Sequence, residues 1–132
     1  MTMKKFALRG LVILAIVVAL CIALHLPPWL SRILLEKAGF EIVWFSPLHD
    51  EALPSGISAL YLPGGYPELY SLELSKNDKM IYSVKSAILH GLPTFAECGG
   101  FMYLHESLDG VPMVGAIRGK CFKTDRMQRF GY

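Results

Sequence analysis

A regular alternation of apolar β-type segments with amphipathic helical segments, from residue 31 onwards, most constrains the fold of this chain. The apolar segments predict strands, and turn residues such as Pro47 and the Pro63-Gly64-Gly65 run end them. Strands are expected at residues 41–48, 57–65, 92–97 and 111–117, and helices at residues 31–40, 66–75, 78–91 and 99–108. Strands that alternate with helices predict an α/β fold, in which a parallel sheet carries helices on both of its faces.

Particular residues are expected to begin and end two of these helices. Ser31 and Asp78 are candidate N-caps, because a short side-chain oxygen accepts hydrogen bonds from the free N–H groups of a first turn. Gly39 and Gly91 are expected to end the same helices, because glycine tolerates the left-handed conformation found at helix C-termini.

Composition narrows the class of protein further. The 132 residues are enough for one small domain. A hydrophobic share of 53%, a charged share of 18% and a net charge of +2 exclude a disordered chain and provide no basic surface for nucleic acid. The three cysteines form no C-x-x-C pair and indicate neither a disulfide framework nor a metal site. We therefore expect a reducing compartment, the cytoplasm.

Residues 1–29 form an apolar segment that precedes the α/β pattern of residues 30–132. Within it, residues 10–26 carry no formal charge, basic residues precede them, and Pro27-Pro28 follows. Such a run has the minimum length of a membrane span, and the basic flank would hold the N-terminus in the cytoplasm. A strand buried on both faces of a parallel sheet has the same composition. The segment is therefore either a first strand or an inner-membrane anchor.

Cys98 stands where an expected strand meets an expected helix, and Gly99 and Gly100 follow it. Ligands of parallel α/β sheets bind beyond the carboxyl ends of the strands. A sharp strand-to-helix turn exposes a nucleophile at this end, and small residues leave room for it. The helix dipole favours a thiolate, and free N–H groups of the first turn can stabilise an oxyanion. A free cysteine more often packs as a small hydrophobe, but this position favours a nucleophile.

Gly64 and Gly65 end the strand that is expected to neighbour the strand before Cys98. Their backbone is therefore expected beside the thiol, where it would supply a second oxyanion donor. The alternative is a tight turn that requires positive φ. Cys21 lies in an apolar run and Cys121 lies beside lysines, so both are interpreted as packing or surface residues.

The segments "WFSPLHDEALP", "ALYLPGGYPELY", "GLPTFAECGGFMYL" and "MQRFGY" occur in this order. Together they resemble the class I glutamine amidotransferase domain of the cobyrinic acid a,c-diamide synthases, over about residues 36–132. The resemblance implies a flavodoxin-like sheet that is incomplete at its C-terminus, so that the chain corresponds to a truncated domain. It also implies an activity, the hydrolysis of the glutamine side-chain amide to supply ammonia for the amidation of corrinoid carboxylates. The nickel-sirohydrochlorin diamide synthases share these motifs, which leaves the acceptor macrocycle open.

Carried over to this chain, the resemblance makes Cys98 the nucleophile that forms a glutamyl thioester. Gly65 and Gly99 would provide oxyanion-hole amides, and Gly64 would shape the turn. The implied partners are glutamine and a corrinoid synthetase domain or chain. ATP and magnesium would belong to that synthetase, since this sequence contains no G-x-x-x-x-G-K-[ST] phosphate loop and no cofactor is expected in it.

The chain departs from the family in its histidines. The family places a catalytic histidine after the "RFGY" stretch, whereas the four histidines here precede it: His25, His49, His90 and His105. Without a base to take the thiol proton and return it to ammonia, the chain alone is expected to be inactive in turnover. The alternative is a non-catalytic, flavodoxin-like binding module, tethered to a membrane through residues 10–26.

Overall fold

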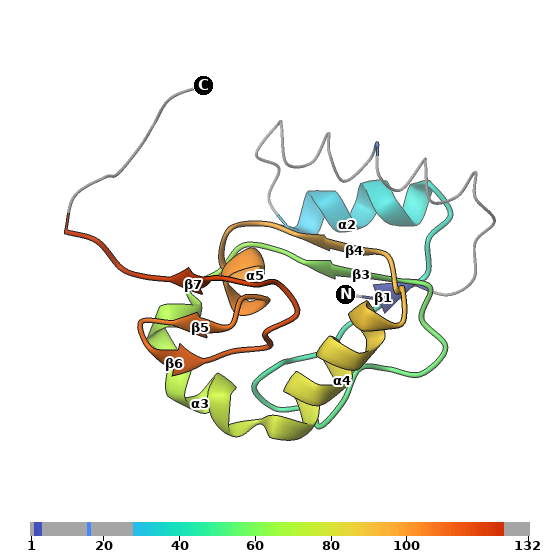
Figure 1. Ribbon diagram of the computed structural model, residues 1–132. Helices are drawn as coiled ribbons and strands as arrows, with labels where there is room; N and C mark the ends of the chain where they lie inside the picture. Colours follow the sequence, from blue (N-terminus) through green and yellow to red (C-terminus); the bar gives the residue numbers. More distant parts are fainter. Residues whose placement is uncertain (1, 4–15, 17–27, 126–132) are drawn as a thin grey trace.

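The computed structural model describes residues 2–3, 16 and 28–125. Its centre is a small sheet that lies between helices on both faces, α2 (Pro28–Lys37) on one side and α4 (Asp78–Leu89) on the other (Figure 1). A short 3-10 helix, η1 (Pro67–Leu69), and α3 (Ser71–Lys76) lead into α4. The predicted α/β class and the helices on both faces are therefore confirmed.

The central sheet has four strands in the order β2-β1-β3-β4. They span Thr2–Met3 (β1), Ile42–Val43 (β2), Ala59–Leu62 (β3) and Thr94–Ala96 (β4). β3 and β4 pair in parallel, as predicted, with Leu60 opposite Thr94 and Leu62 opposite Ala96. β1 runs antiparallel to both β2 and β3, so the sheet is mixed rather than wholly parallel. Two residues are too few to produce a hydrophobic period, which is why the sequence did not predict β1.

Successive residues of β3 pack on opposite faces of the sheet, as strand geometry requires. Ala59 and Tyr61 face α2 and pack with its Leu35 and with Phe40, and all four are buried. On the opposite face, β3 contributes to the main core, whose buried members are Leu60, Leu62, Leu74, Met80, Val84, Tyr103, Leu104, Leu108, Met113 and Val114. β3 is thus buried on both sides, between the two clusters of the core.

The two predicted helix stops are confirmed, and both have the same geometry. After α2, Gly39 has φ +90°, its N–H donates to Glu36 O at 3.0 Å, and the N–H of Phe40 donates to Leu35 O at 3.1 Å. These are the two bonds of a Schellman motif, and the burial of Leu35 and Phe40 supplies its hydrophobic contact. Gly91, with φ +89°, ends α4 in the same way.

Both predicted N-caps are wrong. Ser31 lies inside α2, which already includes Pro28, a residue suited to a first helical turn because it needs no N–H there. The cap of α4 is Asn77 rather than Asp78, and its Oδ1 accepts from Met80 N at 3.3 Å. Asp78 is the first residue of the helix, where its charge complements the helix dipole.

A second sheet, of three short strands in the order β6-β5-β7, replaces two predicted elements. Its strands are β5 (Ser107–Leu108), β6 (Val111–Pro112) and β7 (Lys120–Cys121). The helix predicted over residues 99–108 ends early, because α5 spans only Cys98–Tyr103. The strand predicted over residues 111–117 pairs with β5 and does not join the central sheet. The cause is Asp109-Gly110, whose φ values of +49° and +82° form a two-residue hairpin turn.

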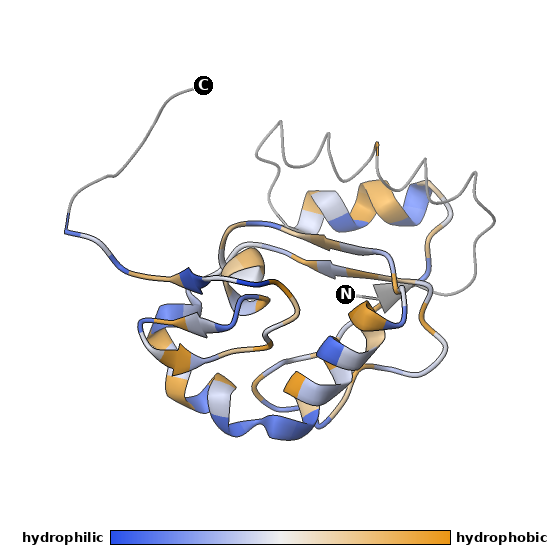
Figure 2. Cartoon of the chain, in the orientation of Figure 1, coloured by the Kyte–Doolittle hydropathy of each residue, from blue (hydrophilic) through white to orange (hydrophobic). Residues whose placement is uncertain are grey.

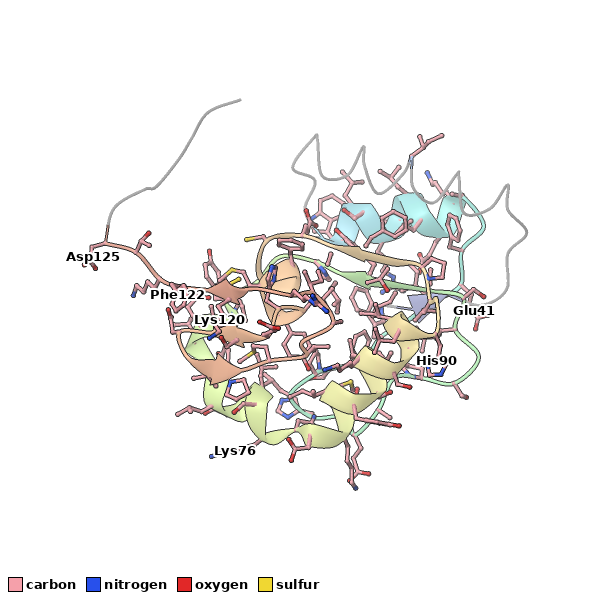
Figure 3. All side chains as sticks on the ribbon, viewed as in Figure 1. Glu41, Lys76, His90, Lys120, Phe122 and Asp125 are labelled. Atoms are coloured by element: carbon pink, nitrogen blue, oxygen red, sulfur yellow. The ribbon has the colours of Figure 1, made fainter. Side chains whose placement is uncertain are left out.

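The surface of the described chain exposes charged side chains and also several large apolar ones. Glu41, Lys76 and Asp125 project outward at the edges of the molecule (Figure 3). Along α2 and α4, apolar turns in orange alternate with polar turns in blue or pale shades (Figure 2). Of residues 10–26 only Ile16 is described, so the choice between first strand and anchor lies outside the described residues. No helix in the described part of the chain is long and apolar enough to cross a membrane.

Candidate nucleophile site at the turn between β4 and α5

Cys98 occupies a strained turn directly after the sheet. A single extended residue, Glu97, separates β4 from α5, and Cys98 begins the helix with φ +46°. A non-glycine residue in this left-handed region costs energy, and such strain is typical of nucleophiles held at strand-to-helix turns. The Cys98 side chain is exposed. The sequence thus places a free thiol in the expected position at the carboxyl end of a parallel strand.

The two glycines after Cys98 allow the backbone of α5 to touch the end of β3. A Cβ atom at Gly99 would lie 2.4 Å from Gly65 O and 2.7 Å from Pro67 Cδ. A Cβ atom at Gly100 would lie 2.4 Å from Leu62 O. No side chain fits at either position, and this explains why small residues follow the thiol.

The loop after β3 brings the predicted oxyanion residues to the thiol. A Cβ atom at Gly64 would lie 3.5 Å from Cys98 Cβ and 4.0 Å from its Sγ, so Gly64 is in van der Waals reach of the thiol. Gly65 contacts Gly99 through its carbonyl group. Within the described residues, the N–H groups of Gly65 and Gly99 donate to no acceptor. The structure therefore brings together all four residues that the sequence suggested, Cys98, Gly64, Gly65 and Gly99.

Three groups of Glu97 form hydrogen bonds within the site: its N–H, its carbonyl oxygen and its carboxylate. The sequence did not predict these bonds. The N–H of Glu97 donates to Leu62 O at 3.0 Å, and its carbonyl oxygen accepts from Gly100 N at 2.9 Å and from Phe101 N at 3.3 Å. Its carboxylate accepts a hydrogen bond from the hydroxyl of Tyr61. This last bond can be predicted only when the register of β3 and β4 is known, because Tyr61 precedes Glu97 by 36 residues in the sequence.

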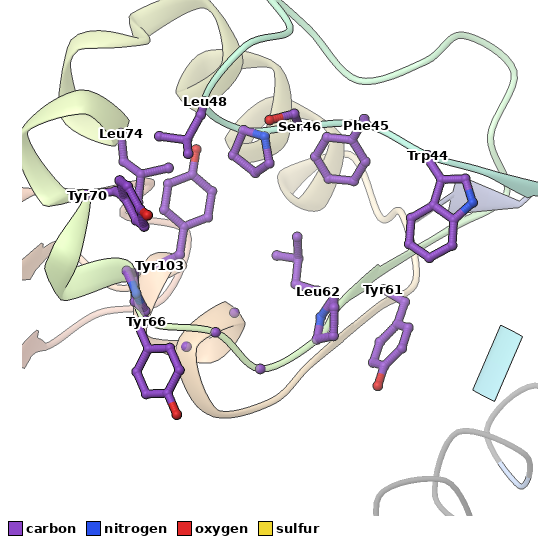
Figure 4. A pocket seen from close by; sticks show the side chains of 17 residues that line it. Trp44, Phe45, Ser46, Leu48, Tyr61, Leu62, Tyr66, Tyr70, Leu74 and Tyr103 are labelled. Atoms are coloured by element: carbon purple, nitrogen blue, oxygen red, sulfur yellow. The ribbon is translucent and has the colours of Figure 1, made fainter. Parts of the chain in front are cut away.

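A pocket of about 290 Å³ opens beside the four glycines, and Cys98 is not among its lining residues (Figure 4). Its walls carry no charged side chain and include six aromatic residues, Trp44, Phe45, Tyr61, Tyr66, Tyr70 and Tyr103. The hydroxyl of Tyr103 is buried and has no hydrogen-bond partner among the residues that the structure describes. Burial raises the pKa of Tyr103 to about 12, so this hydroxyl stays neutral. The pocket suits a neutral group rather than an ion.

None of the described histidines lines this pocket. His49 is exposed in the turn after Ser46, and His90 Nδ1 lies 2.7 Å from Ser86 O at the end of α4. His105 Nδ1 lies 2.9 Å from Phe101 O, and its ring packs edge-on against that of Phe101. His25 lies outside the described residues.

The remaining cysteines do not form part of the site. Cys121 lies in β7 and packs against the main core, in agreement with a packing role. Burial and the nearby charge of Asp109 raise the pKa of the Cys121 thiol, which keeps it protonated. Cys21 lies outside the described residues. Cys98 is thus the thiol placed for chemistry among those that the structure describes.

Residues 33–126 match the model of the CobB/CobQ-like glutamine amidotransferase domain. The chain belongs to this family. The match includes the β3 loop, Glu97 and the Cys98 turn, so the geometry above is that of a CobB/CobQ-like amidotransferase domain. The resemblance stated from the sequence is confirmed.

Several similar curated proteins are named a,c-diamide synthases. Cobyrinate a,c-diamide synthase of Clostridium acetobutylicum is 44% identical over 99 residues, which cover 75% of this chain and 22% of that protein. Its counterpart in Clostridium tetani is 48% identical over 103 residues, with 75% and 23% covered. Hydrogenobyrinate a,c-diamide synthase of Streptomyces coelicolor is 48% identical over 94 residues, with 71% and 19% covered. The chain thus spans about a fifth of the length of these relatives. No solved structure is significantly similar to it.

Proposed function

We propose that this chain is the glutaminase portion of a cobyrinate a,c-diamide synthase, with the flavodoxin-like sheet of class I amidotransferases. One observation carries the proposal. Cys98 stands exposed at positive φ, at the end of a parallel strand, within van der Waals reach of Gly64. Glutamine is the substrate that the family description implies. The relatives' names supply the acceptor, the a- and c-carboxylates of a corrinoid macrocycle.

The Cys98 turn supports the first half of glutamine hydrolysis. The Cys98 thiolate attacks the carbon of the side-chain amide, and the free N–H groups of Gly65 and Gly99 stabilise the tetrahedral oxyanion. The C–N bond then breaks, ammonia leaves with the proton given up by the thiol, and a glutamyl thioester remains. Water hydrolyses the thioester to glutamate and regenerates the thiol.

The proton transfers of this reaction need a base, and none of the described histidines, His49, His90 and His105, lines the pocket beside the Cys98 turn. We therefore propose that the chain alone forms the thioester but turns over very slowly. The ammonia is used by a synthetase, in which ATP and magnesium activate the corrinoid carboxylate. The synthetase is proposed from the names and lengths of the relatives, and its ATP and magnesium from the resemblance of the sequence to this family.

The test uses 6-diazo-5-oxo-L-norleucine, a diazoketone analogue of glutamine that alkylates an attacking thiol with loss of nitrogen gas. We expect one adduct per folded chain, located on Cys98 by peptide mass spectrometry. Cys98→Ser should abolish the adduct, and the matched control Cys121→Ser should leave it unchanged. Excess glutamine should slow the labelling. An unlabelled Cys98 in folded protein, or equal labelling of Cys98 and Cys121, refutes the proposal.

A further inference from the structure

We propose that Tyr61 and Glu97 form a positioning pair, which sets the separation between the Cys98 thiol and the loop of Gly64 and Gly65. This inference rests on the proposed glutaminase function and adds two residues to it. Neither residue is expected to touch glutamine. They act through the backbone segments that carry the nucleophile and the oxyanion donors.

The register of the central sheet makes this pairing possible. Tyr61 lies directly opposite Phe95 in the parallel pair of β3 and β4. Glu97 is two residues beyond Phe95 and therefore lies on the same face, as the diagonal neighbour of Tyr61. Their hydrogen bond crosses between the two strands just before they diverge. From that point β3 leads to Gly64 and Gly65, and β4 leads to Cys98.

The Tyr61 ring is held firmly, so its hydroxyl is a fixed point. Tyr61 is 9% exposed and packs with Leu35, Phe40 and Ala59 under α2. A hydroxyl that donates to a carboxylate makes a charge-assisted bond, which is stronger than a neutral one. The bond therefore connects the core beneath α2 to the side chain of the residue that precedes the nucleophile.

Glu97 transmits this constraint to the reacting groups through its backbone. Its N–H is bonded to Leu62 O, three residues before Gly65, and its carbonyl oxygen holds the first turn of α5. Without the carboxylate bond, the strained turn at Cys98 would lose its side-chain link to the core beneath α2 and would depend on these backbone bonds and on the contacts of Gly99 and Gly100 with the end of β3. A displacement of about 1 Å between reacting groups is enough to slow an enzymatic step about 10²-fold.

The experiment compares two alkylating reagents on the full chain and on Tyr61→Phe, Glu97→Ala and Glu97→Gln. The glutamine analogue 6-diazo-5-oxo-L-norleucine needs both the thiol and the oxyanion donors, whereas iodoacetamide needs the thiol alone. We expect Tyr61→Phe and Glu97→Ala to lower the maximal rate of analogue labelling at least about tenfold. The analogue concentration for half-maximal rate and the iodoacetamide rate at Cys98 should stay near the wild-type values.

Glu97→Gln tests the same bond from its other end, because a glutamine Oε1 still accepts from Tyr61. It should keep the labelling rate within about threefold of wild type, since the bond loses only its charge assistance. The double variant Tyr61→Phe/Glu97→Ala should be no slower than the slower single variant, because both remove one interaction. Tyr82→Phe, on the exposed face of α4, is the matched control and should label at the wild-type rate.

Three results would overturn the inference. One is a wild-type rate of analogue labelling in Tyr61→Phe. Another is a parallel change of the analogue and iodoacetamide rates, which shows general loosening of the fold. A third is Glu97→Gln as slow as Glu97→Ala, which shows that Glu97 acts by charge on the ligand. Absence of labelling in the wild type is a different result and refutes the proposed function itself.

Discussion

Gly99→Ala perturbs the Cys98 turn directly, and the structure gives the size of the steric clash that the added Cβ would cause. The new Cβ would lie 2.4 Å from Gly65 O and 2.7 Å from Pro67 Cδ, whereas packed atoms normally lie about 3.5 Å apart. The shortfall is roughly 1 Å, and both neighbours belong to stiff groups, a backbone carbonyl and a buried proline ring. The first turn of α5 and the Gly65 loop must therefore separate.

The separation of α5 from the Gly65 loop should have two measurable effects, one on stability and one on the rate of labelling. An overpacked site loses about 1–3 kcal/mol of the free energy of unfolding, which urea denaturation followed by circular dichroism measures. A displacement of about 1 Å between Cys98 and the Gly65 amide lowers the rate of labelling by 6-diazo-5-oxo-L-norleucine about 10²-fold. Mass spectrometry of timed samples gives that rate.

Gly64→Ala is the matched comparison. Its Cβ would lie 3.5 Å from Cys98 Cβ, which is an ordinary contact, so the free energy of unfolding should change by less than about 0.5 kcal/mol. If Gly99→Ala unfolds at the same urea concentration as Gly64→Ala and labels at the wild-type rate, the close approach of α5 and the Gly65 loop does not exist in solution. The argument from backbone contact would then be wrong.

Three further substitutions test other parts of the structure. Asn77→Ala removes the cap of α4 and two bonds of 2.8 Å, to Pro47 O and Asp50 O, so urea denaturation should show a loss of about 2–3 kcal/mol. Tyr103→Phe removes a buried hydroxyl that has no partner in the described part of the chain, and it should raise the free energy of unfolding by about 1 kcal/mol. Since burial raises the pKa of Tyr103 from 10.0 to about 12, the unfolded chain ionises first. Wild-type stability should be complete below pH 10 and fall towards pH 12, and Tyr103→Phe should show a smaller fall; equal falls would contradict the burial. Asp109→Asn should lower the pKa of Cys121, because it removes the carboxylate charge that opposes the thiolate. A chromogenic disulfide reagent should then react faster with Cys121 at constant pH, in a variant whose Cys21 and Cys98 are serine, and an unchanged rate would contradict the role of Asp109.

Features that depend on neighbouring residues alone were predictable from the sequence. Gly39 and Gly91 end their helices because the C-terminal motif needs only a glycine and the next apolar residue. The turn at Cys98 was predictable for the same reason, since a strand, a small-residue pair and a helix follow one another directly. The proximity of Gly64 to Cys98 also followed from the parallel order of two strands.

Features that depend on distant residues were not predictable. Asn77 and Asp78 are both good caps, and the choice is made by bonds from Asn77 to Pro47 and Asp50, which lie 30 and 27 residues away. The bond between Tyr61 and Glu97 requires the exact register of β3 and β4. The hairpin at Asp109-Gly110 did have a local signal, but the apolar period of residues 99–108 outweighed it.

The four glycines around Cys98 differ in their tolerance of mutation, although all four positions hold the same residue. A methyl group is forbidden at Gly99 and Gly100, fits at Gly64, and meets nothing within 4 Å at Gly65. A library randomised at all four positions and selected for folded protein would therefore return glycine at the pair after the thiol and a mixture at the pair before it. Glycine that is retained at Gly64 and Gly65 therefore reflects selection for open space beside the Cys98 thiol, which a ligand must enter. It does not reflect selection for the stability of the chain.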